Sequence, residues 1–351
     1  MKQYIACDMH KRYSVFELTD EAGNAREPVR IEHERESVRA FLKSLPSGAP
    51  VAVETMGSWY WMIDDIEEAG LEPRLVHAGK AKVMMGHIHK TDKLDAHGLN
   101  ELQRTGTLPT VWIPPKALRD LRELTRYRMT LTHIRTTLKN RVHATLAKYA
   151  IVIEEVSDLF GKQGRALLQD RVGGLPPETR RCFNSHLDTL DYLEEEIQEM
   201  QRRILELVQQ TPQMKLLMTL PGVGPILATV IALELGTVER FLSAEKLAGY
   251  CGVVPRVIAS GGKCRFGRSV RQANQYLKWA FVEAANVITL QQKRWPQMHV
   301  VKLYHRIKAR KCHAIAAVAV ARHLAEAAYW ILKKGEAYRE PKGCEVSSTH
   351  G

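Results

Sequence analysis

Near the N-terminus, short apolar stretches alternate with stretches in which apolar residues recur every three or four positions. The segments "QYIACDMH", "YSVFELTDEAGNA", "GAPVAVETMG" and "PRLVHAG" are typical of strands, the first ending at Asp8 and the third containing Glu54 at its end. The segments "SWYWMIDDIEEAG" and "TDKLDAHGLNELQRTG" have helical spacing and stop at Gly70 and Gly106, and Ser58 is the expected cap of the first helix. Strands connected by helices predict an α/β domain.

Helical periodicity dominates the rest of the chain. A long helix is expected from Lys116 to about Lys148, and a second from about Ser185 to Gln210. Two interpretations of this pair stay open, a helical hairpin packed on itself and an arm that joins two copies of the chain. The second helix has the seam of a coiled coil, with apolar residues alternating by three and four: Leu190, Leu193, Ile197, Met200, Ile204 and Leu207.

The segment "LPGVGPILATVIALELG" places two glycines between runs with helical spacing. This is typical of the turn of a helix-hairpin-helix, in which Gly222 and Gly224 would let backbone N–H groups approach a phosphate closely. A tight loop without a ligand is the alternative. A last pair of helices is expected to end near Lys334.

These patterns divide the chain into three structured parts and a tail. We expect an α/β domain over residues 1–110, a helical coiled-coil dimerisation segment over 111–212 and a mostly helical C-terminal domain over 213–335. The first boundary follows from the Pro-containing stretch "LPTVWIPP". The polar residues 336–351 are predicted to be disordered.

The charge of the chain makes nucleic acid the expected partner. Its 351 residues include 51 Lys and Arg against 39 Asp and Glu, a net charge of +12. Such a field attracts polyanions, although a solvated basic surface would have the same composition. The residues expected to contact nucleic acid are the two turn glycines, Gly222 and Gly224, and nine cations: Lys90, Lys93, Arg126, Arg135, Lys139, Lys263, Arg265, Arg268 and Arg271.

Several other classes of protein are disfavoured. The six cysteines are scattered without a CxxC pair, which argues against a disulfide framework and a zinc site. The N-terminus lacks the apolar run of a signal peptide, and no stretch approaches about 20 consecutive apolar residues. We therefore expect a cytoplasmic protein with no membrane partner.

Four carboxylates are the candidate metal ligands. Asp8 and Glu54 end apolar strands, at the edge where α/β sheets form their sites. Asp92 and Asp95 are three positions apart, so they share one face of a helix. Four converging carboxylates repel one another unless cations neutralise them, and oxygen ligands suit Mg²⁺ or Mn²⁺. Two such ions would support phosphoryl transfer, whereas helix caps or solvated surface charges are the alternative.

A serine is the candidate nucleophile. Ser260 precedes Gly261 and Gly262 in what we expect to be a flexible loop, and the cations at 263, 265, 268 and 271 follow closely. A serine hydroxyl there could attack a phosphodiester while the cations stabilise the developing charge. A simple turn is the alternative, and Ser269 is the competing hydroxyl, more typical of a helix cap.

The motifs in both halves resemble those of one family. "ACDMHKRY", "VAVETMGSWYW" and "HKTDKLDAHGLNEL" in the first half are similar to the N-terminal motifs of the insertion-sequence one-ten transposases, relatives of the Piv DNA invertase that are also called DEDD transposases. "LPGVGPILATVIALELG", "LAGYCGVVPR", "SGGKCRFGRS" and "YLKWAFVEAA" resemble their C-terminal transposase domain. The likeness covers roughly residues 3 to 335 with order and spacing in agreement.

The resemblance implies a more specific picture. The first domain would have a RuvC-like, RNase H-like fold whose Asp8, Glu54, Asp92 and Asp95 bind Mg²⁺, and Ser260 would be the covalent nucleophile. Relatives act as homodimers and homotetramers, and some are guided by a structured non-coding RNA that pairs with DNA. One departure is Ala259, where relatives often have a second serine.

Taken together, residues and resemblance predict a DNA transposase that cuts and rejoins DNA by serine attack assisted by Mg²⁺. A site assembled from two subunits is a further hypothesis. Two other functions are compatible with parts of the pattern. One is a metal-only RuvC-like nuclease or junction resolvase that uses water as its nucleophile. The other is a nucleic-acid-binding protein without catalytic activity.

Overall fold

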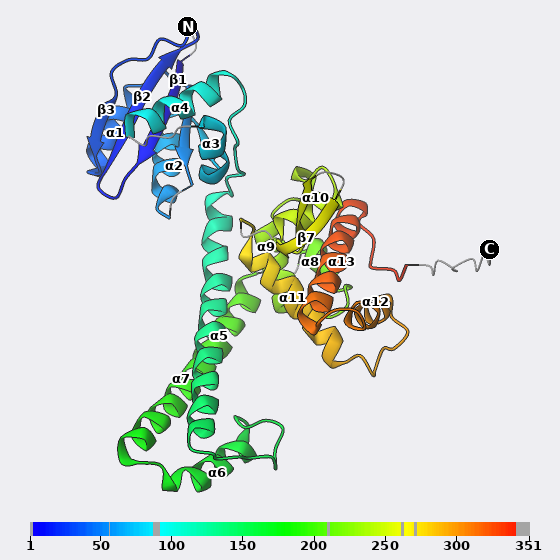
Figure 1. Cartoon of the computed structure of the whole chain (residues 1–351). Coiled ribbons are helices and arrows are strands. Elements are labelled where there is room, and N and C mark those ends of the chain that lie inside the picture. The colour runs from blue at the N-terminus through cyan, green and yellow to red at the C-terminus, as the bar shows by residue number, and fades with distance from the viewer. Residues whose placement is uncertain are drawn as a thin grey trace, which may run out of the picture. The chain divides into compact units, whose positions relative to one another are not determined.

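The computed structural model of the chain describes residues 3–55, 57–86, 92–208, 211–260, 263–269 and 272–341. The chain divides into two compact units, Met1–Pro114 and Pro115–Gly351 (Figure 1). The division falls within the Pro-containing stretch from Leu108 to Pro115. The first unit is mixed α/β and the second is mostly helical.

A five-stranded sheet forms the centre of the first unit. Its strand order is β3-β2-β1-β4-β5, in which β1, β2 and β3 are antiparallel and β4 and β5 run parallel to β1. The sheet therefore combines an antiparallel meander of β1, β2 and β3 with two further strands, β4 and β5, that run parallel to β1 and require crossover connections. The strands are β1 (Gln3–Met9), β2 (Tyr13–Asp20), β3 (Val29–Glu32), β4 (Pro50–Glu54) and β5 (Glu72–Val76).

Both faces of this sheet are covered by helices. The larger side chains, such as Ile5, Cys7 and Val53, pack against α1 and α2 on one face. The alternating small residues Ala6 and Ala52 face α3 and α4 on the other, where their lack of bulk lets the helices approach closely. The helices are α1 (Arg35–Lys43), α2 (Trp59–Glu68), α3 (Ala78–Met85) and α4 (Asp92–Arg104).

The helix boundaries largely follow the expected signals. Gly70 and Gly106 follow α2 and α4 with positive φ, as expected for glycines that stop helices. Ser58 occupies the N-cap position of α2, as predicted, although its side chain makes no capping hydrogen bond.

In the second unit, α5 (Lys116–Lys148) and α7 (Pro177–Leu207) form an antiparallel helical hairpin, with α6 (Lys162–Arg171) near its turn (Figure 1). The seam of α7 packs on α5 of the same chain: Leu193 and Ile197 contact Leu131. This arrangement is the one that the hairpin interpretation predicts. Helix α7 begins well before the expected start near Ser185, and Leu207 at its end is 44% exposed rather than part of the seam.

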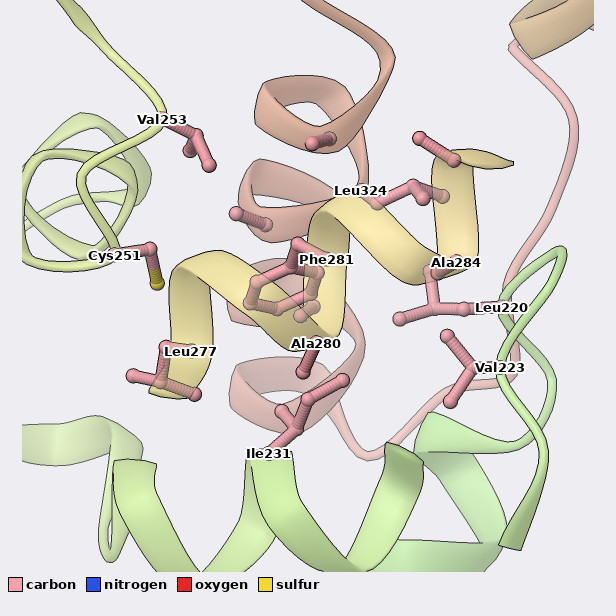
Figure 2. Close-up of a cluster of buried hydrophobic side chains, with 14 of the residues drawn as sticks. Leu220, Val223, Ile231, Cys251, Val253, Leu277, Ala280, Phe281, Ala284 and Leu324 are labelled. Carbon is pink, nitrogen blue, oxygen red and sulfur yellow. The ribbon is translucent and has the colours of Figure 1, made fainter. Parts of the chain in front are cut away.

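The remainder of the second unit is a helical bundle carrying one β-hairpin. Phe281 of α11 is fully buried and lies between α9 and α13, close to Ile231 and Leu324 (Figure 2). The elements of this bundle are α8 (Pro212–Leu217), α9 (Pro225–Leu235), the 3₁₀ helix η2 (Val238–Arg240), α10 (Ala244–Tyr250), β6 (Pro255–Ser260), β7 (Lys263–Ser269), α11 (Gln275–Leu290), α12 (His299–Lys308) and α13 (His313–Lys334). Another 3₁₀ helix, η1 (Val172–Gly174), lies between α6 and α7.

One expectation about the C-terminal part needs correction, and another is not overturned. By length and composition α13 could cross a membrane, but half of its apolar window is buried inside the bundle, so this helix does not contradict the expectation of no membrane partner. The predicted disordered tail begins at residue 336, yet Tyr338 donates its backbone N–H to Thr219 Oγ1 (2.9 Å) and Glu340 accepts from His299 N (2.8 Å). Residues 342–351 lie outside the described part of the chain.

Candidate active site

Asp8 and Glu54 lie at matching positions on neighbouring strands. In the parallel ladder of β1 and β4, Cys7 is opposite Val53, and the two carboxylates follow immediately. Because side chains alternate along strands, both carboxylates belong to the face of Ala6 and Ala52, which α4 covers. Asp8 is 9% exposed and Glu54 is half-buried. The fold thus brings together two of the predicted acids at the carboxyl edge of the sheet.

Buried hydrogen bonds fix the direction of α4 across this face. Gln103 Nε2 donates to the carbonyl of Ile5 (3.1 Å), and Asn100 Nδ2 donates to the carbonyl of Glu17 (2.9 Å). The C-terminal end of α4 therefore lies near the start of β1, and the N-terminal end of α4 lies near the carboxyl edge of the sheet. From Gln103 back to Asp95 is about 12 Å of helix, and from Ile5 to Asp8 is about 10 Å of strand. Asp95, which is half-buried, is consequently at the level of Asp8.

A histidine that the sequence reasoning missed contacts Asp8. His10 Nε2 is 3.2 Å from Asp8 Oδ2, and the imidazole stacks on Tyr13 with ring centroids 4.5 Å apart. The guanidinium of Arg30 covers Tyr13, 3.7 Å from its ring centroid. This stack restrains the Asp8 carboxylate from one side. The sequence contained one signal for this contact, because His10 follows Asp8 by two positions at the end of an apolar strand.

The other predicted ligands and cations of this unit are only partly visible. Asp92 begins α4, but its side chain and that of Lys93 lie outside the described atoms, and Lys90 lies outside the described residues. Among the side chains that are described, no group of three or more His, Cys, Asp or Glu is close enough to hold a metal ion. The described geometry brings together Asp8 and Glu54 and directs the start of α4 towards them.

Ser260 is the last residue of β6, where it pairs with Lys263 at the start of β7. The expectation of a flexible loop is therefore wrong for Ser260 itself, because its backbone belongs to a strand, whereas Gly261 and Gly262 lie outside the described residues. The side chains of Ser260, Lys263 and Arg268 lie outside the described atoms, and Arg271 lies outside the described residues. Arg265 is exposed on β7.

Ser269, the competing hydroxyl, does not cap a helix. It ends β7, and α11 is capped instead by Asn274, whose Oδ1 accepts from the backbone N–H groups of Tyr276 and Leu277 (both 3.0 Å). The backbone N–H of Asn274 donates to the carbonyl of Tyr250 (2.9 Å). This bond closes the base of the segment that carries the serine hairpin.

A buried carboxylate anchors the base of this hairpin. Glu234, at the end of α9, is fully buried and receives Asn274 Nδ2 (2.9 Å). Arg126 of α5 donates to both of its oxygens (2.7 and 3.1 Å). Arg122 donates to the carbonyls of Leu233 and Glu234 (2.8 and 2.9 Å). One carboxylate therefore links α5, α9 and the start of α11.

We expect Glu234→Ala to lower the free energy of unfolding by about 3–5 kcal/mol, because it leaves the buried guanidinium of Arg122 and that of Arg126 without their carboxylate. The matched control is Glu194→Ala, which removes the partner of Arg135 at a site that is 45% exposed. A solvent-screened pair of this kind contributes about 0–1 kcal/mol. Chemical denaturation of both variants measures the difference, and equal losses would contradict the expectation.

The cations of α5 that were predicted to contact nucleic acid have interaction partners within the protein. Arg126 binds Glu234, Arg135 Nη1 contacts Glu194 Oε2 at 2.7 Å, and Lys139 Nζ lies 4.7 Å from the ring centroid of Phe160. These contacts give the three residues structural partners within the second unit. Their presence on a basic helix therefore does not by itself indicate an exposed surface for nucleic acid.

The two turn glycines differ in what surrounds them. Gly222 has φ of +74°, and a Cβ there would lie 2.3 Å from the carbonyl oxygen of Ala284 on α11. Close packing of the turn on α11 thus requires this glycine, and Figure 2 shows its neighbours Leu220 and Val223 beside Ala284. A Cβ on Gly224, the residue before α9, would meet no atom within 4 Å. Of the two glycines, Gly224 is the one with open space in front of it.

Two buried cysteines can be excluded as nucleophiles. Burial raises the pKa of the Cys7 thiol far above its ordinary value, and burial does the same to the pKa of Cys251. Both thiols therefore stay protonated at neutral pH, and a thiol in that state is a poor nucleophile. Cys7 precedes Asp8 but faces the opposite, apolar side of the sheet.

Two family models match the chain in the regions that contain the candidate residues. A model for the transposases of DEDD and IS110 type matches residues 5–151, and a model described as the transposase IS116/IS110/IS902 family matches residues 214–300. The chain belongs to the IS110 family of transposases. The resemblance noted in the motifs is thus confirmed, and with it the activity of a DNA transposase.

Relatives align over most of this IS110-family chain. A probable family 20 transposase of Pseudomonas aeruginosa is 25% identical over 88% of the chain and 91% of its own length. A putative transposase of Sinorhizobium fredii, y4pF/y4sB, is 26% identical over 98% of the chain and 88% of its own length. The transposase for insertion sequence element IS1328 of Yersinia enterocolitica is 22% identical over 95% of the chain and 98% of its own length.

Proposed function

We propose that this transposase cuts and rejoins DNA through attack by Ser260, assisted by Mg²⁺ or Mn²⁺ held by Asp8, Glu54, Asp92 and Asp95. The observation that carries the proposal is the matching position of Asp8 and Glu54 on adjacent parallel strands, directly after the pair Cys7 and Val53, with α4 directed towards the same edge. Two carboxylates at the same edge of the sheet in a partly buried setting favour a bound cation.

The strand order supports an RNase H-like, RuvC-like assignment of the first unit. Three antiparallel strands followed by two parallel ones, in the order β3-β2-β1-β4-β5, are the arrangement expected of that fold. Its acidic residues would come from the end of β1, the end of β4 and a helix on one face. These are the positions of Asp8, Glu54 and the start of α4.

The donor chemistry fits the metal. Carboxylate oxygens are the preferred ligands of Mg²⁺ and Mn²⁺, and no sulfur or nitrogen ligand is among the four predicted residues. Such ions would stabilise negative charge on a phosphoryl group. His10, which contacts Asp8, would orient that carboxylate rather than bind metal itself.

The proposed chemical step forms one bond to phosphorus and breaks another, and it needs no further reactant. Ser260 Oγ forms a bond to a backbone phosphorus, the bond from phosphorus to one sugar oxygen breaks, and the serine proton passes to the departing oxygen. Lys263 and Arg265, close to Ser260 in the hairpin, would offset charge on the phosphoryl oxygens. Attack by another sugar hydroxyl on the phosphoserine reverses the step and rejoins the DNA.

Partners beyond DNA belong to the same proposal. We propose that the protein works in the cytoplasm as a homodimer or homotetramer, with a structured non-coding RNA directing it to DNA. The net charge of +12 supports binding of both nucleic acids. The helix-hairpin-helix would contribute through the turn at Gly224, which has open space in front of it.

Incubation with element-end DNA, Mg²⁺ and co-expressed RNA tests the proposal. We expect a covalent protein–DNA adduct that survives denaturation and carries phosphoserine at Ser260 in peptide mass spectra. Omission of the divalent ion should abolish it. Cleaved DNA without any adduct would instead support a metal-only nuclease, and DNA binding that is indifferent to Mg²⁺ without cleavage would support a non-catalytic binding protein.

A further inference from the structure

The turn between α12 and α13 carries an unusual concentration of positive charge. From His299 to Ala325 the sequence contains six Lys and Arg and no Asp or Glu. Five of them are exposed and form what we call the α12–α13 cation patch. The patch consists of Lys302, Arg306, Lys308, Arg310 and Lys311.

These five cations differ from other basic residues of the chain in their surroundings. Within the ranges described above, no carboxylate lies in ion-pair distance of any patch residue, whereas Arg126 and Arg135 of α5 bind Glu234 and Glu194. The sixth cation, Arg322, pairs with Glu326 outside the patch. The patch cations are therefore exposed to solvent, and one of them, Lys308, also has its Nζ 5.4 Å from the ring centroid of Tyr304.

The turn that carries the patch is held in place. Tyr304 is 2% exposed and its hydroxyl is 2.8 Å from Nδ1 of His313, joining the two helices. The backbone N–H groups of Arg310 and Lys311 both donate to the carbonyl of Ile307 (3.0 and 2.9 Å). The cations thus project from helix α12 and from the fixed turn that follows it, which limits the entropy lost when they bind a partner.

Two patch residues lie between two helix ends whose dipoles act on them in opposite directions. Arg310 and Lys311 follow Lys308 at the C-terminal end of α12, where positive charge is favourable. They also precede Cys312, the N-cap of α13, where positive charge is unfavourable, and Cys312 makes no side-chain capping bond. Because the two effects oppose each other, the helix dipoles alone do not account for the cations at this turn.

We infer that the α12–α13 cation patch binds the phosphate backbone of duplex DNA. A duplex presents about one negative charge per 1.7 Å of its axis, so it can engage several cations at once, unlike a small anion. The patch lies beyond both family matches, which end at residues 151 and 300. The inference rests on the DNA transposition of the family and does not depend on Ser260 or on a metal.

Replacement of four patch cations, Arg306, Lys308, Arg310 and Lys311, by glutamine tests this inference in the full chain. Affinity for a 30-base-pair duplex is measured by fluorescence anisotropy from 50 to 200 mM salt, without divalent ions. We expect at least tenfold weaker binding at 50 mM. The slope of log K against log salt should shrink by about 2–4, at about 0.9 for each phosphate that the variant no longer neutralises.

The matched control removes the same charge from α7, with Arg180, Arg181, Arg202 and Arg203 changed to glutamine. Two of these arginines, Arg202 and Arg203, are paired with Glu199 or Glu206, so we expect the slope to stay within about one unit of the wild type. If both variants lost the same affinity for the duplex, the net charge of the chain would explain the loss, and the inference would be overturned. So would an unchanged slope in the patch variant, or a loss confined to an RNA duplex of the same sequence.

A second variant, Arg310→Gln with Lys311→Gln, keeps the test valid if the fourfold change impairs folding. It removes only the two cations that lie between α12 and α13. We expect about half of the change in slope together with a thermal midpoint close to that of the wild type, because the effects of the two helix dipoles oppose each other. A lower midpoint with an unchanged slope would show that the two residues serve the fold and would contradict the inference.

Discussion

Ser260→Ala is expected to abolish the covalent protein–DNA adduct and to reduce strand exchange by at least about a thousandfold. The variant loses only the hydroxyl oxygen that would bond to phosphorus. Because the hairpin is held by backbone pairing between β6 and β7, the fold should be unaffected. Affinity for duplex DNA should stay within about twofold of the wild type, since one neutral hydroxyl contributes little to phosphate binding.

Ser269→Ala is the matched control for this prediction, because Ser269 ends the other strand of the same hairpin and is not a helix cap. It should form the adduct at close to the wild-type rate. Three results would count against the assignment: an adduct that persists in Ser260→Ala, an adduct lost only in Ser269→Ala, or cleavage by Ser260→Ala without any adduct. The last result would favour water as the nucleophile.

Where local pattern and burial coincide, the sequence predicted the fold closely. The long helix from Lys116 to Lys148 has the predicted ends, and the buried strands ending near Asp8 and Glu54 are present. The mixed α/β first unit and the mostly helical remainder agree with the expected fold class. Continuous apolar runs and three-to-four spacing are strong signals because they reflect burial along a whole element.

Elements without such a signal were missed. Strand β3 has only four residues, three of them exposed, and α3 has little segregation of apolar from polar residues. The hairpin of β6 and β7 exposes Val257 and Ile258, so pairing of the backbones rather than burial of side chains holds it. Such elements depend on interactions that the local pattern does not contain.

The same limit applies to the candidate site. Strand ends marked Asp8 and Glu54 correctly as neighbours, because register follows from parallel pairing of two apolar strands. The anchoring of Asn274 by Glu234 and Arg126 joins residues 40 and 108 positions apart, and no spacing rule encodes it. Basic residues on a helix looked alike in sequence, whereas the fold separates the paired cations of α5 from the exposed ones of the α12–α13 cation patch.

Asp8→Asn is expected to lower strand exchange by at least about a thousandfold and to weaken binding of Mn²⁺, used as a probe, at least tenfold. The amide keeps the shape and burial of the carboxylate but removes the negative charge that would bind the cation. Isothermal titration calorimetry with Mn²⁺ measures the second effect independently of activity. DNA binding without divalent ions should be unchanged, because Asp8 is 9% exposed and contacts His10.

Glu72→Gln is the matched control for Asp8→Asn, since it removes the same charge from the same sheet at a side chain that is 57% exposed and paired with Arg74. Its strand exchange and Mn²⁺ affinity should stay within about twofold of the wild type. If Asp8→Asn bound Mn²⁺ as tightly as the wild type while losing activity, Asp8 would act without a metal. If both variants lost affinity equally, the cation would be responding to the charge of the whole sheet, and the four carboxylates would not form a specific site.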